Sequence, residues 1–371
     1  MNTSNMEKLP EYKLGDICSF QQGMQFGIEE QLSEPKDGYI RFLRIENYTQ
    51  KSKDFRYVKL EDKTKIISEK DVVIVRYGAS AGYVGREYSG VLANNLFRVI
   101  PSDKIINDYL YYILTDDRVF NFFQKSMIGG AMPALSFKIV QNLKVLLPPK
   151  PEQQKIADIL STWDKAIELK EKLIEQKKEQ KKGLMQRLLT GKVRLPGFEG
   201  KWEKVKLGDI IKECKEQTTK NNEYPVLTSS RKGLFLQEDY FSKQVASVDN
   251  TGYKIVRKGD FTYRTMSDDG NFVFNQLENY EIGIVSPAYA VFRPTKVNSI
   301  FLRHLLNSYN FKKYIKKIVQ GGTRLSLRFN DLKEIRVIIP SLEEQNAIGD
   351  VLRKAEEQIA LMEQELFELK Q

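Results

Sequence analysis

The side chains in this sequence best suited to specific recognition are amides, guanidinium groups and hydroxyls at polar positions. Gln and Asn can pair with adenine through two hydrogen bonds in the DNA major groove, Arg can do so with guanine, and hydroxyls reach phosphates. The first half of the chain offers these candidates for DNA contact: Gln21, Gln22, Gln25, Arg41, Arg44, Asn47, Tyr48, Arg76, Ser80 and Tyr83.

The second half offers a corresponding set. Its members are Thr228, Ser229, Ser230, Arg231, Lys232, Arg264, Ser267 and Arg324. Any one of these residues taken alone is more typical of a solvated loop than of a DNA contact. Because such residues recur in corresponding loops of both halves, we predict that the two sets bind DNA.

Residues for catalysis are harder to find. His304 is the sole histidine, and its helical surroundings predict a partly exposed structural residue. The sequence therefore lacks the histidines needed for a histidine-based zinc site, and the isolated His304 gives no support for a Ser-His-Asp triad. The sequence has no G-x-x-x-x-G-K-[ST] loop and no Asn-Pro-Pro-aromatic tetrapeptide of amino-methyltransferases. The segment 78–85, GASAGYVG, lacks the helix and acidic residue of a dinucleotide loop, so we interpret it as a turn. We predict no catalytic residue, no metal site and no cofactor on this chain.

The elements that must position the candidate residues repeat along the chain. Strands are predicted within Tyr12–Gly23, at Tyr39–Ile45 and Asp71–Tyr77, then from Tyr224 and at Asp260–Arg264. One helix is predicted at Asn107–Lys125 and its counterpart at Phe301–Lys317. Scaffold positions repeat while loop positions diverge, as expected if both halves use one fold to read different targets.

Two long helices follow the globular halves. The first begins after Pro148 and runs to about Leu188, and the second follows Pro340 to the C-terminus. Apolar residues at helical and heptad spacing predict a seam between them, with polar gaps. The seam residues are Leu160, Trp163, Ile167 and Ile174 on the first helix and Leu352, Ala355, Ile359, Met362 and Leu366 on the second.

The helices belong to an internal repeat. A shift of 192 residues lays Pro148 on Pro340, Gln153 on Gln345 and Ile156 on Ile348. The same shift lays GGAMPALSFKIVQNLKVLLP (129–148) over GGTRLSLRFNDLKEIRVIIP (321–340). The chain is therefore two copies of one module, each a globular half followed by a long helix.

The repeated run of hydrophobic strand, Pro, Glu-Gln-x-x-Ile and long heptad helix resembles the specificity subunits of type I restriction–modification enzymes. The resemblance covers essentially the whole chain. It implies an α+β fold in which two pseudo-repeated target recognition domains are separated by two antiparallel coiled-coil helices. We expect recognition domains at residues 1–150 and 191–342 and spacer helices at 151–190 and 343–371. The linker rich in glycine and proline at 191–204 is counted as the start of the second domain.

The resemblance also implies the partners of a non-catalytic subunit. Two modification subunits would carry S-adenosylmethionine and methylate adenine in each half-site, and restriction subunits would add ATP- and Mg-dependent translocation and cleavage. From the repeat itself we expect an approximately twofold arrangement reading a bipartite, asymmetric site. A first helix of ~55 Å can hold two domains one turn of B-DNA apart, ~34–36 Å.

Bulk properties agree with these expectations. The 371 residues carry a formal net charge of +10, which suggests a polyanionic partner or merely a solubilising surface. Cys18 and Cys214 are interpreted as small apolar residues. No apolar run is long enough to span a membrane, and no signal-peptide core is evident, so we expect a cytoplasmic protein. Lys177–Lys182 is read as a solvated helix face, with phosphate or protein contact as alternatives.

Two other functions remain open at this point. A coiled-coil scaffold with two protein-binding domains would show no salt-dependent duplex binding. A complete nuclease or methyltransferase would show metal- or cofactor-dependent activity in the pure chain.

Overall fold

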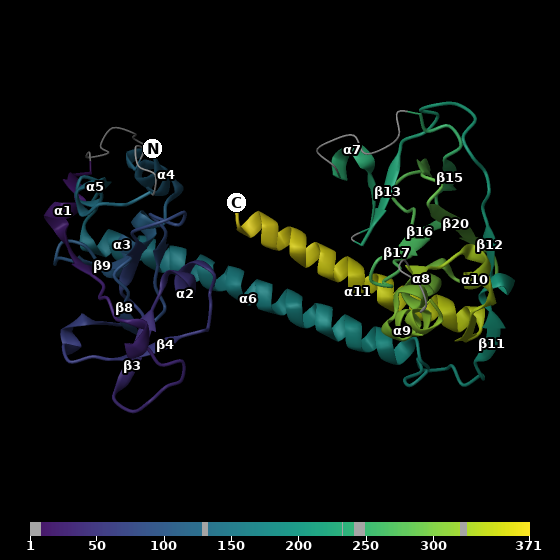
Figure 1. The fold of residues 1–371 in the computed structure, drawn as a ribbon, viewed down its shortest axis with the longest axis horizontal. Helices are drawn as coiled ribbons and strands as arrows, with labels where there is room; N and C mark the ends of the chain where they lie inside the picture. The colour runs from purple at the N-terminus through teal and green to yellow at the C-terminus, as the bar shows by residue number, and fades with distance from the viewer. Residues whose placement is uncertain (1–8, 128–132, 232, 241–248, 320–324) are drawn as a thin grey trace, which may run out of the picture. The chain divides into compact units, whose positions relative to one another are not determined.

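A computed structural model describes residues 9–127, 133–231, 233–240, 249–319 and 325–371 of the chain. The chain divides into two compact units, Met1–Ala166 and Ile167–Gln371. Each unit combines strands with helices, and the long helix α6 (Lys150–Leu188) contributes residues to both. The mixed composition, its repetition and the two long helices confirm the predicted α+β fold (Figure 1).

The first unit is built on two four-stranded sheets. One has the order β2 (Cys18–Gln22), β9 (Leu96–Pro101), β6 (Val72–Val75) and β7 (Val84–Gly85). The other has the order β4 (Arg56–Lys59), β3 (Tyr39–Leu43), β8 (Gly90–Leu92) and β5 (Ile66–Ile67). A separate ladder joins β1 (Glu11–Lys13) to β10 (Lys144–Leu146). The helices are α1 (Leu14–Ile17), α2 (Ile45–Thr49), α3 (Asn107–Leu114), α4 (Asp117–Ser126) and α5 (Phe137–Gln141).

The second unit has one four-stranded sheet, of order β12 (Ile211–Glu213), β20 (Tyr289–Pro294), β16 (Phe261–Arg264) and β18 (Asn275–Gln276). Four strand pairs accompany it: β11 (Glu203–Lys206) with β22 (Arg336–Ile339), β13 (Leu227–Ser230) with β14 (Gly233–Leu236), β15 (Lys254–Arg257) with β19 (Ile282–Val285), and β17 (Met266–Ser267) with β21 (Leu325–Ser326). The helices are α7 (Gln237–Tyr240), α8 (Ser299–Asn307), α9 (Tyr309–Ile318), α10 (Phe329–Glu334) and α11 (Leu342–Leu369).

The repeated Glu-Gln motif is a structural clamp in both units. The Gln153 amide donates to the Pro148 carbonyl at 2.8 Å and accepts from the Ile106 backbone N–H at 2.9 Å. Gln345 makes the same two bonds, to the Pro340 carbonyl at 2.9 Å and from Asn298 N–H at 3.0 Å. Each buried glutamine therefore ties the start of a long helix to the strand before it and to the start of α3 or α8.

An ion pair to a buried aspartate also repeats. Arg98 on β9 contacts Asp71 at 2.7 Å, and Arg293 on β20 contacts Asp260 at 2.6 Å. Each aspartate also accepts a backbone N–H three residues earlier, from Ser68 or Arg257. These bonds align Asp71 with Asp260 and fix which strand positions of the two units are equivalent.

Each of the predicted helices at 107–125 and 301–317 is in fact two helices. Asp116 is extended (φ −63°, ψ 134°), and its side chain accepts from Arg118 N–H as the N-cap of α4. Ser308 does the same for α9, with φ −66° and ψ 151°. An N-cap residue inside a helical pattern starts a new helix because its side chain satisfies a free N–H group of the next turn.

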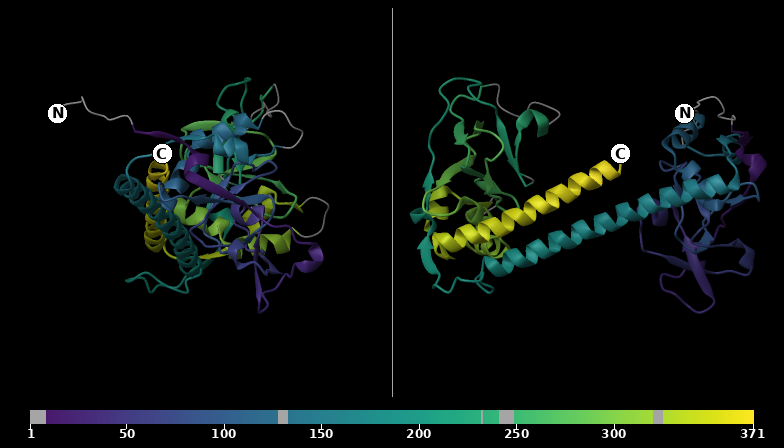
Figure 2. Two further views of the ribbon diagram at one scale, coloured as in Figure 1. Left: turned by 90° about the vertical axis from the view of Figure 1, so that its left-hand side faces the viewer. Right: turned by 180° about the vertical axis from the view of Figure 1, so that it is seen from behind.

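α11 packs antiparallel against the C-terminal part of α6 (Figures 1 and 2). Ile174, Ile359 and Met362 are buried, Ile167, Ala355 and Leu366 are half-buried, and Leu352 lies in the core of the second unit. The polar gaps of the seam contain ion pairs: Lys181–Glu356 at 2.7 Å, Lys178–Glu363 at 2.9 Å, Glu171–Lys370 at 2.6 Å, and Lys170–Glu365. The interpretation of Lys177–Lys182 as a solvated face is therefore wrong for Lys181.

Two residues expected in the seam lie elsewhere. Leu160 is 39% exposed and Trp163 is 51% exposed. Both precede Glu171, whose partner Lys370 directly follows the last residue of α11. The contact between α6 and α11 therefore begins C-terminal to these two side chains. The apolar stripe on α6 extends beyond the part of the helix that α11 covers.

Among the described residues, no helix combines the length and apolar composition needed to cross a membrane. Both cysteines are free. Burial raises the pKa of Cys18 to about 12, and burial followed by the charge of Asp260 raises the pKa of Cys214 to about 11. Neither thiol is poised as a thiolate.

Candidate nucleic-acid interface

The first candidate set contains a compact cluster at the end of β2. Gln22 Nε2 donates to the Asn94 carbonyl at 3.1 Å, and the Asn94 side chain donates to Gln25 Oε1 at 3.0 Å. Gln21 lies on β2 opposite Arg98. The two hydrogen bonds join the exposed amides of Gln22, Asn94 and Gln25 around one turn, whereas Gln21, the strand neighbour of Gln22, points to the other face of β2.

Arg76 lies beside this turn. Its backbone N–H donates to Asn95 O at 2.8 Å, and its guanidinium lies over the rings of Tyr77 and Phe137 at 4.9 and 5.1 Å. Arg76 Nε is buried without a hydrogen-bond partner within the described part of the chain. Aromatic stacking restricts the guanidinium to few orientations, so a base contact would cost little further ordering. We call Gln22, Gln25, Asn94 and Arg76 the first recognition cluster.

The predicted turn at 78–85 follows Arg76. Gly78 and Gly82 have φ of +86° and +90°, a conformation that side chains disfavour. Tyr83 N–H donates to Ser80 O at 3.0 Å, which closes the turn. Ser80 is half-buried and Tyr83 is 38% exposed, so both lie at the surface beside the cluster.

Asn47 and Tyr48 do not lie on a recognition surface. Asn47 is fully buried; its Oδ1 accepts from Arg44 N–H at 2.8 Å and its Nδ2 donates to Ser52 O at 2.9 Å. Tyr48 is 4% exposed and packs against Tyr88. In this structure the polar groups of Asn47 and the ring of Tyr48 hold α2 and the loop after it, and neither side chain faces the solvent.

Arg41 and Arg44 are placed on the other sheet. Arg41 is exposed on β3, with its guanidinium 4.8 Å from the Phe55 ring centre. Arg44 pairs with Glu46 at 2.9 Å and donates to Asp54 O at 2.9 Å. Arg44 is thus committed to its own loop, whereas Arg41 presents an available cation.

The second candidate set gathers around the hairpin β13–β14. Asn275 Nδ2, on β18, donates to Ser229 Oγ and to Ser230 O, both at 2.8 Å. Arg231, at the turn, pairs with Asp269 at 2.6 Å, and Ser267 Oγ donates to the same carboxylate at 2.9 Å. The Asn271 N–H, then Ser267 and Arg231, lower the pKa of Asp269. The hairpin tip and the β17 loop are therefore one polar unit.

Other members of the second set are placed differently. Thr228 is buried on β13. Arg264 is exposed on β16, opposite Tyr289. The carbonyl of Thr265 accepts from Leu327 N–H as that of Arg76 accepts from Leu135 N–H. Arg76 therefore corresponds to Thr265. Arg264 is one residue out of register with it and points to the opposite face of its strand.

Two of the predicted DNA-contact residues, Lys232 and Arg324, lie outside the described residues.

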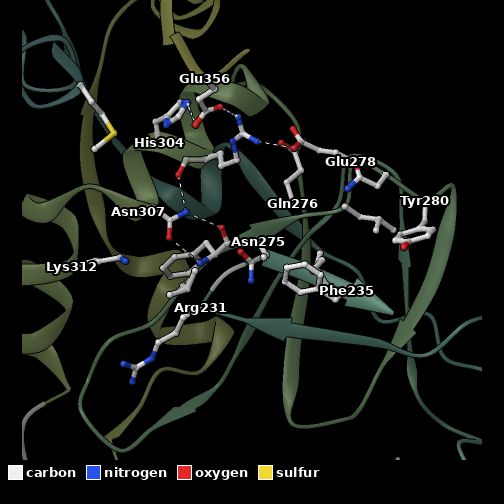
Figure 3. Close-up of a pocket in the computed structure, with 18 of the residues that line it drawn as sticks. Arg231, Phe235, Asn275, Gln276, Glu278, Tyr280, His304, Asn307, Lys312 and Glu356 are labelled. Carbon is white, nitrogen blue, oxygen red and sulfur yellow. Dashed lines mark hydrogen bonds and ion pairs between the residues drawn. The ribbon is translucent and has the colours of Figure 1, made fainter. Parts of the chain in front are cut away.

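Sequence reasoning missed Lys312 on α9. With Arg231 and Asn275 it lines a cavity of about 590 Å³ in the second unit (Figure 3). Burial, then the charge of Arg231, lower the pKa of Lys312. Lys312 and Arg231 therefore give this cavity two cations, of which Arg231 is paired with Asp269. We call Ser229, Ser230, Arg231, Ser267, Asn275 and Lys312 the second recognition cluster. The four lysines in Tyr309–Ile318 could have indicated from the sequence that this helix carries a cationic surface.

His304 is buried rather than partly exposed. Its side chain is 7% exposed and faces Glu356. Burial lowers the pKa of His304 to about 4, so the ring is neutral at pH 7. No group of three or more His, Cys, Asp or Glu residues is arranged to bind a metal ion within the described ranges. Both clusters offer hydrogen-bonding groups together with at least one cation each.

Comparison with known proteins identifies the family. The sequence pattern of the type I restriction modification DNA specificity domain matches residues 6–178 and again residues 199–371. The type I restriction enzyme MjaVIII specificity subunit of Methanocaldococcus jannaschii is 27% identical over 381 residues, 95% of this chain and 87% of that protein. The type I restriction enzyme HindI specificity subunit of Haemophilus influenzae is 27% identical over 170 residues, 43% of this chain and 36% of that protein.

Solved structures share the fold. The S subunit of a type I restriction–modification system from M. genitalium aligns with a TM-score of 0.57 at 15% identity, over 100% of this chain and 95% of that one. The HsdS subunit from Thermoanaerobacter tengcongensis aligns with a TM-score of 0.52 at 17% identity, over 98% and 94%. With both copies of the module matched, this chain belongs to the family of type I restriction–modification specificity subunits, the non-catalytic subunits that recognise DNA.

Proposed function

We propose that this subunit reads a bipartite, asymmetric DNA site, with one half-site for each recognition domain. The domains are assigned to residues 1–150 and 191–342, and the spacer helices to 151–190 and 343–371. The observation that carries the proposal is the contrast within the repeat. The clamp glutamines and the Asp–Arg pairs are equivalent in both units, whereas the recognition clusters differ: each has one asparagine and one arginine, but glutamines accompany them in the first cluster and serines and a lysine in the second. Equal scaffolds with different reading residues suit two different half-sites.

The first cluster is richer in amides and the second in hydroxyls and cations. Gln22 and Gln25 suit adenine, and Arg76 suits guanine, through base edges in the major groove. In the second cluster Arg231 would exchange Asp269 for a base or phosphate, and Lys312 would contact a phosphate as a point charge. Gln21, Arg41, Ser80, Tyr83, Thr228 and Arg264 remain candidates for flanking contacts.

The long helices would set the gap between the half-sites. The 39 residues of α6 span ~58 Å at 1.5 Å per residue, more than the ~34–36 Å of one DNA turn. α11 pairs with the C-terminal part of α6, and a helix of fixed length supported in this way would act as a rigid spacer. The gap would then be a property of helix length and packing, independent of the half-site sequences.

The same helices would recruit the catalytic subunits. Ile159, Leu160 and Trp163 on α6 are 58, 39 and 51% exposed, an apolar surface of the kind that partner proteins cover. We assign this surface to the two modification subunits, which bring S-adenosylmethionine; restriction subunits bring the ATP- and Mg-dependent activities. Acting on cellular DNA, the complex would work in the cytoplasm.

The experiment is selection of bound duplexes from a randomised library by the full chain, followed by a salt titration. We expect two different half-sites at one fixed gap, and affinity that falls steeply with salt because several phosphates are neutralised. A single contiguous site, or binding that does not respond to salt, would refute the proposal.

A further inference from the structure

A single carboxylate joins three helices in the second unit. Glu356, on α11, contacts Lys181 of α6 through Oε1 at 2.7 Å and Arg303 of α8 through Oε2 at 2.7 Å. His304, also on α8, lies 3.8 Å from Oε1. Figure 3 shows the Glu356 carboxylate facing the His304 ring at the edge of the cavity. The helix pair and the globular part of the unit therefore meet at Glu356.

The network continues toward the reading hairpin. Arg303 also contacts Glu278 at 2.7 Å, just after β18. Asn275 of β18 holds Ser229 and Ser230 of β13. Polar contacts and one short strand thus lead from α6 and α11 to the second recognition cluster. The helix pair, α8 and the hairpin are therefore linked by a continuous set of contacts.

The equivalent joint of the first unit has different chemistry. The clamp glutamines align Asp164 with Glu356 and Tyr112 with His304. Tyr112 donates its hydroxyl hydrogen to Asp164 at 2.8 Å. No ion pair between described residues includes Asp164, so this joint is one hydrogen bond from a neutral donor, where the second joint has two cations on one carboxylate.

The charged groups that join the helices at Glu356 are partly buried. The side chains of Lys181, Arg303 and Glu356 are 24, 22 and 32% exposed. Burial alone would raise the pKa of Glu356, but the Lys181 hydrogen bond and the charges of Arg303 and Lys181 lower it. The carboxylate is therefore ionised at pH 7, and charge-assisted hydrogen bonds of this kind are short and orientation-dependent.

We propose that Glu356 is a positioning residue that fixes the second recognition domain on the helix pair and so restricts the gap length the subunit accepts. This inference rests on the proposed two-domain reading of DNA. Glu356 touches no base; it acts by holding α8, and through it the hairpin, at one angle to α6 and α11.

The test uses the full-length chain and the duplex selected by the wild type. Affinity is measured for that duplex, for duplexes with one base pair added to or removed from the gap, and for a duplex carrying only the second half-site. Glu356→Gln removes the charge and keeps the side-chain size. Glu356→Asp keeps the charge. Glu363→Gln is the matched control, since Glu363 pairs with Lys178 on the same seam.

We expect Glu356→Gln to reduce discrimination against the wrong gap by about tenfold, as loss of one charge-assisted contact of ~1.4 kcal/mol would do. Affinity for the isolated second half-site should stay within about twofold. Glu356→Asp should retain most of the discrimination, and Glu363→Gln all of it.

Two results would overturn the inference alone: wild-type gap discrimination in Glu356→Gln, or an equal loss for the isolated half-site, which would mean that Glu356 only stabilises the domain. A wild-type chain that accepts all gaps equally would overturn both this inference and the proposed measurement of the gap.

Discussion

In the first unit the long helix is tied to α3 by the Tyr112–Asp164 hydrogen bond, whereas in the second unit the corresponding tie is the ionic group around Glu356. The first turns of α6 and α11 differ in the same way, with a charged network among the described residues only in the second unit. Glu152 is exposed, but its equivalent Glu344 is 2% exposed and accepts from Arg194 and Trp202 of the linker. One backbone plan thus carries neutral contacts in one copy and buried charges in the other.

The comparison shows which contacts define the module and which were free to change. The glutamine clamps satisfy backbone groups that every copy must bury, so their chemistry is fixed. At the contacts around Asp164 and Glu356, by contrast, side chains bond only to other side chains. They can therefore exchange a phenol and carboxylate for an imidazole, a carboxylate and two cations.

Breaking the helix common to both units should have the largest effect. Proline at Ile167 removes a helical N–H and clashes with the preceding turn, at a cost of ~3 kcal/mol or more. We expect Ile167→Pro to abolish two-part recognition, while Ile167→Ala, which leaves the helix intact, retains it. Duplex selection checks both variants. Recovery of both half-sites at one gap by the proline variant would show that a continuous α6 is not required.

The clamps should be equivalent in energy as well as geometry. Gln153→Leu and Gln345→Leu each remove the bonds to one backbone N–H and one carbonyl that the clamps share, which should lower the free energy of unfolding by about 4 kcal/mol. Gln153→Leu also removes a bond to the Lys104 carbonyl, 3.0 Å long. Urea unfolding measures the loss. Gln154→Leu is the control, because Gln154 is exposed and bonds only to Asp158 on its own helix. Clearly unequal losses would mean that the repeat conserves shape without conserving stability.

The joints should differ in their response to pH. The pKa of His304 is lowered from 6.5 to about 4 by burial, so between these values the unfolded chain binds a proton that the folded chain does not. Stability should fall as pH drops from about 6.5 to 4, by about 3 kcal/mol. Denaturant unfolding of His304→Gln at several pH values should lack this loss.

Tyr112→Phe provides the contrast in the first unit. Burial and the bond to Asp164 raise the pKa of Tyr112, so it does not titrate in this range. We expect this variant to keep the wild-type pH dependence below pH 6.5. If His304→Gln kept it as well, His304 would not be the group responsible.

The smallest effects should come from the reading residues, and they should separate the two units. Arg76→Ala should relax base specificity at one position of the first half-site only, and Arg231→Ala at one position of the second only. Each change should cost about 1–3 kcal/mol of binding free energy. Arg118→Ala is the control, because Arg118 is exposed on α4 and pairs locally with Asp116. Competition binding with half-site variants measures this. Relaxation of both half-sites by one change would contradict independent reading.

The sequence by itself determined the repeat, the two long helices and the polar turns that end the strands. These features are periodic or local: a heptad stripe, a proline before a helix and a glycine turn act within a few residues. The repeat then identified Gln153 and Gln345 as equivalent before their bonds were known. The single helices predicted at 107–125 and 301–317 could have been divided correctly, since Asp116 and Ser308 are typical cap residues.

Tertiary structure decided which polar residues face the solvent. Asn47 and Arg76 look alike in the sequence as polar residues near strands. One is buried in a loop clamp and the other stacks at the surface, because their partners lie in different places along the chain. Lys312, Asn275 and Glu356 gained their roles from residues more than thirty positions away or on other elements. Hydrogen bonding and burial depend on such distant neighbours, whereas helix and turn formation depend mainly on adjacent residues.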